Sequence, residues 1–184
     1  MGARHRCPSG GAGMITVRDF QPGDAVAIAS WLDGPEALFA WSGNNGFSWP
    51  FVPDELVAGH AADPARHVLV GVDTGGSPVA HLILRPDAHN WSARVGMVLV
   101  SPASRGRGHG AAIMEAALRL AFEKLGVHRV DLGVYLHNAA AIRLYERLGF
   151  VREGVHREVT LVGGEWWSSM NMSILAHEWR PRLS

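Results

Sequence analysis

The most constraining feature of this sequence is a glycine-rich turn between a strand pattern and a helix pattern. Residues 94–100 are almost continuously apolar, which is typical of a buried central strand. Residues 105–110 read Arg-Gly-Arg-Gly-His-Gly, and a helical pattern then runs to about residue 125. Backbone N–H groups at a helix start are free to bind anions, and glycines let a ligand approach them closely. The turn therefore predicts a phosphate-binding site.

Two well-known phosphate-binding loops fit this turn poorly. The glycine spacing is not the Gly-x-Gly-x-x-Gly of dinucleotide folds. No Lys-Ser or Lys-Thr pair follows Gly110, as a nucleoside-triphosphate loop requires. A flexible surface turn without any ligand is the remaining alternative that the residues alone leave open.

The rest of the chain alternates between strand and helix patterns. Before the turn we expect, in order, a strand at 14–20, a helix at 25–32 capped by Asp24, an ordered aromatic loop at 34–53, a short helix at 54–62, and a hairpin of strands 67–73 and 78–85. After it we expect a strand at 129–136, a helix from the Asn138 cap to Leu148, and two strands around Gly163-Gly164. Glycine inside the central strand, at Gly96, predicts a bulge. The pattern indicates one mixed α/β domain at 14–180.

Charge and composition exclude several classes of protein. Lys+Arg and Asp+Glu both number 17 in 184 residues, so no overall field favours nucleic acid or a membrane surface as a partner. The single cysteine, Cys7, rules out an internal disulfide and fits the cytoplasm, and no apolar run reaches the roughly 18 residues of a membrane span. We expect a cytoplasmic protein without a metal site, preceded by a disordered, glycine-rich leader at 1–13.

Two motifs resemble a known family. Arg105-x-x-Gly108-x-Gly110 after a strand is similar to the acetyl-CoA signature of the GNAT acetyltransferase superfamily. The segment 138–150 is similar to that family's Asn-x-x-Ala-x-x-x-Tyr-x-x-x-Gly-Phe pattern. The resemblance implies the GNAT fold, a central mixed but mostly antiparallel sheet of six to seven strands, splayed at the centre and flanked by about four helices. Outside these two motifs, the strand order and the Trp166-Trp167 strand resemble the branch of the family that acetylates ribosomal-protein N-termini.

The resemblance also implies a reaction and its residues. Such enzymes transfer the acetyl group of acetyl-CoA to an amine by direct attack in a ternary complex. Tyr145 corresponds to the general acid that protonates the departing thiolate; its other interpretation is a core aromatic residue. The implied acetyl-CoA contacts are Val98, Leu99 and Val100 in the central strand, then Arg105, Gly106, Arg107, Gly108, His109, Gly110 and Ala111 in the turn, and Asn138, which an N-cap role alone would also explain.

One expected residue is missing. Many relatives carry a glutamate early in the central strand as the general base, and Arg94 stands at that position here. The candidates to replace it are His81, His137 and Glu153. Removing a proton at pH 7 costs much less free energy for an α-amine of pKa ~8 than for a lysine amine of pKa ~10.4. We therefore expect a protein or peptide N-terminus, or a small-molecule amine of low pKa, as the acceptor.

Other functions and contacts stay open at this point. A noncatalytic acyl-CoA-binding module on the same fold would not need the glutamate that this chain lacks, and a nucleotide-binding enzyme of another class could share the glycine turn. The aromatic segment 41–51 either shapes the acceptor site or packs in the core. Trp166 and Trp167 should face opposite sides of a strand, and the apolar C-terminal strand is suited to pairing across a homodimer.

Overall fold

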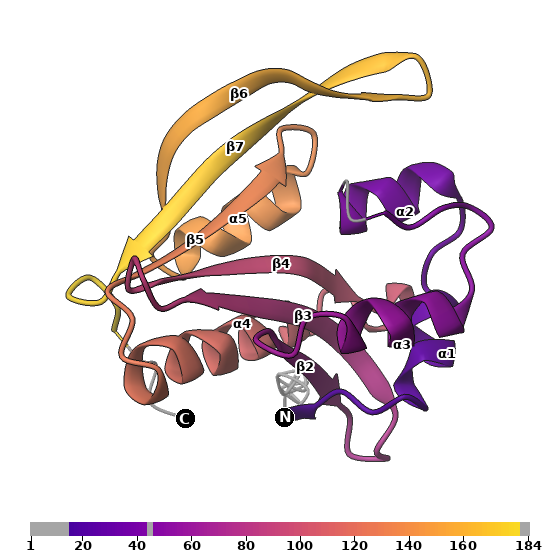
Figure 1. The fold of residues 1–184 in the computed structure, drawn as a ribbon, viewed down its shortest axis with the longest axis horizontal. Helices are drawn as coiled ribbons and strands as arrows, with labels where there is room; N and C mark the ends of the chain where they lie inside the picture. The colour runs from indigo at the N-terminus through magenta and orange to yellow at the C-terminus, as the bar shows by residue number, and fades with distance from the viewer. Residues whose placement is uncertain (1–14, 44–45, 181–184) are drawn as a thin grey trace, which may run out of the picture.

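The computed structural model describes residues 15–43 and 46–180. Seven strands form one sheet in the order β1-β2-β3-β4-β5-β7-β6 (Figure 1). Every neighbouring pair is antiparallel except β4 and β5, which are parallel. The strands are β1 (Thr16–Asp19), β2 (His67–Val72), β3 (Pro78–Asp87), β4 (Ser92–Val100), β5 (Arg129–Tyr135), β6 (Val151–Val162) and β7 (Glu165–Leu175). The predicted fold class, a mixed and mostly antiparallel sheet, is confirmed.

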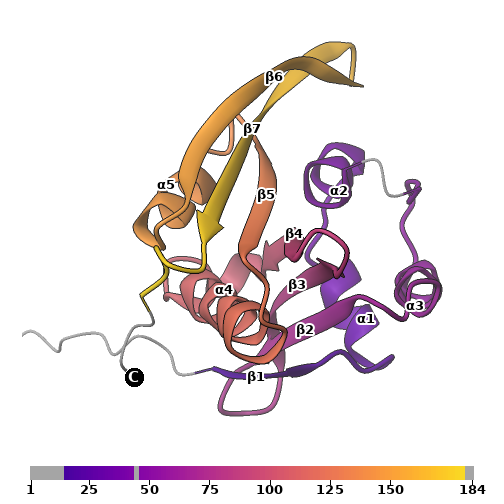
Figure 2. The same cartoon turned by 60° about the vertical axis from the view of Figure 1, so that its left-hand side comes forward.

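Helices cover both faces of the sheet (Figure 2). They are α1 (Asp24–Ala29), α2 (Pro35–Ser42), α3 (Pro53–Ala61), α4 (His109–Arg119, continued by a π-helical turn Leu120–Lys124) and α5 (Ala139–Arg147). The helices α4 and α5 pack in one apolar cluster, and α1, α2 and α3 pack in a second. No helix of the described residues is long and apolar enough to cross a membrane. The leader predicted at 1–13 lies outside the described residues.

The segment expected as an ordered loop contains a helix, α2, so that expectation was wrong in part. Pro35 stands in the first turn of α2, and Leu38 and Trp41 lie three residues apart and are buried. Residues at i and i+3 share one helical face, so this short segment buries one side against the sheet. Glycines at both ends, Gly34 and Gly43, gave the segment the composition of a loop.

Asp24 does not cap α1 as predicted, because it is the first residue of the helix itself. Its buried carboxylate accepts a hydrogen bond from the Gln21 N–H (2.8 Å) and pairs with Arg18 at 2.8 Å. The arginine lies in β1. The carboxylate therefore joins β1 to α1 instead of satisfying the helix N–H groups.

The strands β4 and β5 separate in the middle of the sheet. Their pairing runs only from Ser92 opposite Arg129 to Val95 opposite Leu132. On the other side of β4, the register with β3 shifts after Gly96, so that two residues, Met97 and Val98, occupy the space opposite one residue of β3. The two strands diverge beyond this point (Figure 1).

The bulge was predicted at Gly96, but its unusual backbone lies one residue later. Met97 has φ 50°, in the left-handed region, whereas Gly96 remains paired with Ile83. A non-glycine residue held there costs on the order of 1–3 kcal/mol and persists only when surrounding contacts enforce it. The glycine does not relieve this strain, so contacts around Met97 must maintain the bulge.

Candidate active site

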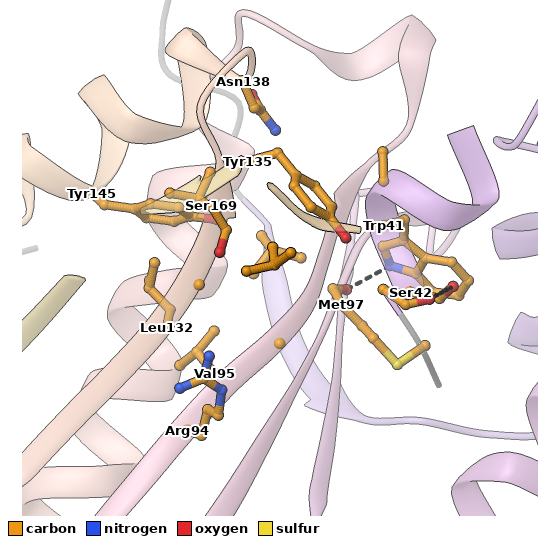
Figure 3. Close-up of a pocket in the computed structure, with 17 residues that line it drawn as sticks. Trp41, Ser42, Arg94, Val95, Met97, Leu132, Tyr135, Asn138, Tyr145 and Ser169 are labelled. Atoms are coloured by element: carbon orange, nitrogen blue, oxygen red, sulfur yellow. Dashed lines mark hydrogen bonds between the residues drawn. The ribbon is translucent and has the colours of Figure 1, made fainter. Parts of the chain in front are cut away.

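A cavity of about 270 Å³ opens where β4 and β5 separate (Figure 3). Six elements contribute residues to it, which places residues far apart in the sequence around one space. Its lining comprises residues 40–43 at the end of α2, 94–98 of β4, 132–135 of β5, and Asn138, Tyr145, Val159 and Ser169. Among the described residues that line it, Arg94 is the only one with a charged side chain. The bulge residues Met97 and Val98 form part of the wall.

Tyr145 lies on α5 and is buried, with 6% of its surface exposed. Burial raises the pKa of the phenol to about 12, so it stays protonated at neutral pH and has a proton to give to a leaving group. Proton transfer to a thiolate whose acid has a pKa of ~8.5 would then be uphill by about 5 kcal/mol. The same burial would raise the pKa of a thiol formed in the cavity, which narrows this difference.

Asn138 caps α5 as predicted. Its side-chain oxygen accepts a hydrogen bond from the Ala141 N–H at 3.1 Å. The residue also lines the cavity that Tyr145 lines. The cap fixes the start of the helix that carries Tyr145, so Asn138 positions this side chain whether or not it also contacts a ligand.

The glycine turn has the geometry of an anion-binding loop. Gly106 and Gly108 have φ of 77° and 84°, which favour glycine, and α4 begins directly afterwards at His109. A side chain at Gly106 would meet no atom within 4 Å, so the space beside the backbone is open. Free N–H groups at this helix start therefore border an accessible surface. The residues present fit a bound diphosphate.

The predicted acetyl-CoA-binding residues differ in their exposure and in whether they line the cavity. Of the strand residues, only Val98 lines the cavity. Arg105 and Arg107 are exposed beside the turn, whereas the His109 side chain is buried and its Nδ1 has no partner among the described residues. A methyl group at Gly110 would come within 3.2 Å of Leu144, so this glycine allows α4 to pack against α5. His109 and Gly110 can contact a ligand only through the backbone.

None of the three proposed replacements for the missing base lines the cavity. Glu153 is held by Arg129 at 2.6 Å and by the Ser173 hydroxyl at 2.7 Å, and the hydrogen bond from Arg129 lowers the pKa of its carboxyl to about 2. His137 is exposed and stacks on Tyr135. Arg94 itself pairs with Asp131 of β5. The cavity thus offers an incoming amine no free carboxylate from its described lining.

His81 is completely buried and belongs to a pair of neutral histidines. Its Nδ1 lies 3.0 Å from the Met97 carbonyl oxygen, and its Nε2 lies 3.1 Å from Nε2 of His60 on α3. A carbonyl only accepts, so His81 carries its proton on Nδ1, and His60 donates from Nε2. Burial lowers the pKa of His81 to about 3 and that of His60 to about 4. Both side chains are uncharged at neutral pH.

This pair predicts a loss of stability in mild acid. In the unfolded chain these histidines bind protons near pH 6.5, whereas in the folded chain they do not until about pH 4. Their contribution to the free energy of unfolding is therefore largest above pH 6.5 and falls as the pH drops below it. Between pH 7 and pH 5 the wild type should lose about 2 kcal/mol more unfolding free energy than His60→Gln, which keeps a donor but cannot be protonated. Urea unfolding of both proteins at each pH measures this difference; equal losses would contradict the assignment.

Most residues of the cavity were not predicted as site residues, and three of these have polar groups or large aromatic rings that face it (Figure 3): Trp41, Tyr135 and Ser169. Trp41 comes from α2, and its ring is buried against Phe47 and Phe51. Tyr135 ends β5, and Ser169 lies opposite it on β7. The aromatic composition of 41–51 pointed to Trp41, which packs in the core and also lines the cavity; a role in shaping the acceptor site stays a prediction. No local pattern indicates Tyr135 or Ser169.

The two adjacent tryptophans of β7 face opposite sides, as predicted. Trp166 is 59% exposed. Trp167 packs edge-on against Phe39 of α2 and Tyr135 of β5, with ring centroids 6.3 and 5.1 Å apart. This aromatic cluster joins the β6–β7 hairpin to α2 beside the cavity.

Comparisons with known proteins agree in one family. The model of the acetyltransferase (GNAT) family matches residues 25–150. Spermidine N(1)-acetyltransferase of Vibrio cholerae is 31% identical over 91% of this chain and 96% of its own length. A mycothiol acetyltransferase of Salinispora tropica is 31% identical over 77% of this chain but 46% of its own. Spermidine N-acetyltransferase from Vibrio cholerae, solved in complex with CoA and spermine, superposes with a TM-score of 0.75 at 25% identity, covering 89% of this chain and 96% of that one.

Proposed function

Because this chain belongs to the acetyltransferase (GNAT) family and is an N-acetyltransferase that uses acetyl-CoA, we propose that its acceptor is a primary amine of low pKa. The amine attacks the thioester directly in a ternary complex. The acceptor is the α-amine of a peptide or protein, or a small-molecule amine that is partly neutral at pH 7. The observation that carries this proposal is a cavity whose described lining has no carboxylate.

The cosubstrate occupies the turn and the gap between β4 and β5. Amides of residues 105–111 hold the diphosphate at the start of α4, where Gly106 and Gly108 have positive φ and the space beside Gly106 is open. The pantetheine arm runs along Val98, Leu99 and Val100, which β5 leaves unpaired because its ladder with β4 ends at Val95. The thioester then lies at the bulge, and Tyr145 protonates the CoA thiolate as the C–S bond breaks. The proton that the nitrogen loses as the amide bond forms returns to the Tyr145 phenolate, which restores the hydroxyl.

The absence of a base limits the acceptor. An α-amine of pKa ~8 is about one-tenth neutral at pH 7, whereas a lysine amine of pKa ~10.4 is neutral in only about four molecules per ten thousand. Without a carboxylate in the cavity to remove the proton, the enzyme depends on the amine that is already neutral. The one charged side chain of the described lining, Arg94, is positive, and no negative side chain lies beside it in that lining. The cavity therefore has no negative charge to pair with the ammonium groups of a polyamine such as spermidine, the acceptor in the name of one relative.

An acceptor panel tests this proposal. At pH 7, kcat/KM for a peptide with a free α-amine should exceed that for its N-blocked analogue with one lysine by at least about tenfold, because the neutral fractions differ roughly 250-fold. Spermidine should be no better than the lysine peptide. CoA release measured with each amine, on the same enzyme, gives the ratios. A preference for the ε-amine or for spermidine would contradict the proposed acceptor but not the acetyl transfer.

A homodimer stays a prediction. The apolar side chains at Val151, Val155, Leu161 and Trp166 are exposed on the β6–β7 hairpin, which extends beyond the rest of the sheet (Figure 1). A surface of this kind suits association with a second copy.

A further inference from the structure

The strained residue of the bulge is fixed by two hydrogen bonds to one atom. The indole Nε1–H of Trp41 donates to the Met97 carbonyl oxygen at 2.7 Å, and the Nδ1–H of His81 donates to the same oxygen at 3.0 Å (Figure 3 shows the Trp41 bond). Trp41 is 7% exposed and His81 is completely buried, so water does not compete for this oxygen. The two donors come from different elements, α2 and β3, and their rings lie edge to face with centroids 5.6 Å apart.

This arrangement explains why Met97 keeps a positive φ. The carbonyl has turned out of the ladder between β3 and β4, where the register shift leaves Met97 and Val98 opposite a single residue. A backbone carbonyl that leaves its ladder inside the protein needs replacement donors. Trp41 and His81 supply two such donors. His60 in turn donates to Nε2 of His81, which leaves the proton of His81 on Nδ1.

The carbonyl direction decides the direction of the next amide. In a planar trans peptide the C=O of one residue and the N–H of the following residue point in opposite directions. With its carbonyl held towards Trp41 and His81, the Met97–Val98 peptide directs the Val98 N–H away from them. Val98 lines the cavity and packs against the cluster that contains Tyr145.

We propose that Trp41 and His81 are positioning residues, which act through the Met97 carbonyl to aim the Val98 N–H at the acetyl carbonyl of the cosubstrate. The inference rests on the proposed placement of the thioester at the bulge. Attack by the amine turns that carbonyl oxygen into an oxyanion, and an N–H aimed at it in advance stabilises the charge as it develops. The two side chains act in this step through the backbone and not by contact with the reacting atoms, so their loss should lower kcat more than it raises KM for acetyl-CoA.

Trp41→Phe tests the tryptophan, because it removes the indole N–H and keeps an aromatic ring. We expect kcat to fall about tenfold, the usual consequence of one lost buried hydrogen bond, with KM for acetyl-CoA within about twofold of the wild type. Trp31→Phe is the matched control, since Trp31 packs against the same apolar cluster but does not line the cavity. It should leave both constants unchanged. Equal kcat values for Trp41→Phe and the wild type would overturn the inference.

A pair of variants tests His81. Asparagine can donate from Nδ2 at about the place of the histidine Nδ1, whereas leucine cannot donate. We expect His81→Leu to lower kcat about tenfold and His81→Asn to restore most of it, with thermal midpoints recorded for both. If the two variants are equally stable and equally slow, the hydrogen bond to Met97 is not what supports the rate.

An NMR titration tests the same inference without turnover. In the wild type, acetyl-CoA but not CoA should shift the Val98 amide proton downfield, because only the thioester brings a carbonyl to it. Trp41→Phe should reduce this shift, and Trp31→Phe should not. Identical Val98 shifts with both ligands in the wild type would refute the inference, whether or not an active acceptor has been found. Failure of every amine to be acetylated, with the Val98 shift intact, would instead refute the proposed acceptors and leave the positioning role standing.

Discussion

Tyr145→Phe should lower kcat about 100-fold or more, with little change in KM for acetyl-CoA. General acid catalysis contributes typically 10²–10⁴-fold, and the described lining of the cavity contains one other phenol, that of Tyr135. Burial raises the pKa of Tyr145 to about 12, so the side chain remains a proton donor throughout the pH range in which an α-amine is neutral. Steady-state release of CoA with a fixed amine measures both constants.

Tyr135→Phe is the matched control for this prediction. Both tyrosines line the cavity, and both changes remove only a hydroxyl. The Tyr135 hydroxyl lies 3.4 Å from that of Thr160, a long contact whose loss should change kcat by no more than about threefold. Thermal midpoints of both variants show whether the fold is intact. Equal effects of the two changes would remove Tyr145 from the role of general acid.

Gly108→Ala should weaken binding of CoA and acetyl-CoA about 100-fold. Two effects add, since an L-residue at φ 84° is strained and its methyl group blocks the approach of a diphosphate to the amides before α4. Loss of one or two charge-assisted hydrogen bonds, at roughly 1.5–3 kcal/mol each, accounts for a change of this size. Calorimetric titration with CoA gives the dissociation constant directly.

Gly126→Ala separates strain from binding. Gly126 also has a positive φ, 65°, and a methyl group there would meet no atom within 4 Å. It lies at the opposite end of the same helical segment, beyond Lys124. Both variants should lose about 1–2 kcal/mol of stability from backbone strain, while only Gly108→Ala should lose affinity. If both bind CoA like the wild type, the diphosphate is not held at the turn.

Most of the local elements, and the resemblance to the family, can be recognised from residues that are neighbours in the chain. The glycines of the turn, the Asn138 cap and the Tyr145 helix are recognisable because each role depends on residues within a few positions of one another, and the structure contains the turn, the cap and the helix as predicted. The positive φ values at Gly106 and Gly108 follow from the same local chemistry. Length and charge balance could exclude classes of protein but could not select this one.

The centre of the site, in contrast, is built from contacts between residues far apart in the chain. Trp41 lies 56 residues from the carbonyl that it holds, and Arg94 pairs with a carboxylate 37 residues away. The bulge was expected at Gly96 because glycine tolerates unusual backbone, yet it is Met97 that adopts the positive φ. The reason is physical: strand register and converging donors from other elements fix the peptide there, and these long-range contacts leave no periodic pattern in the chain.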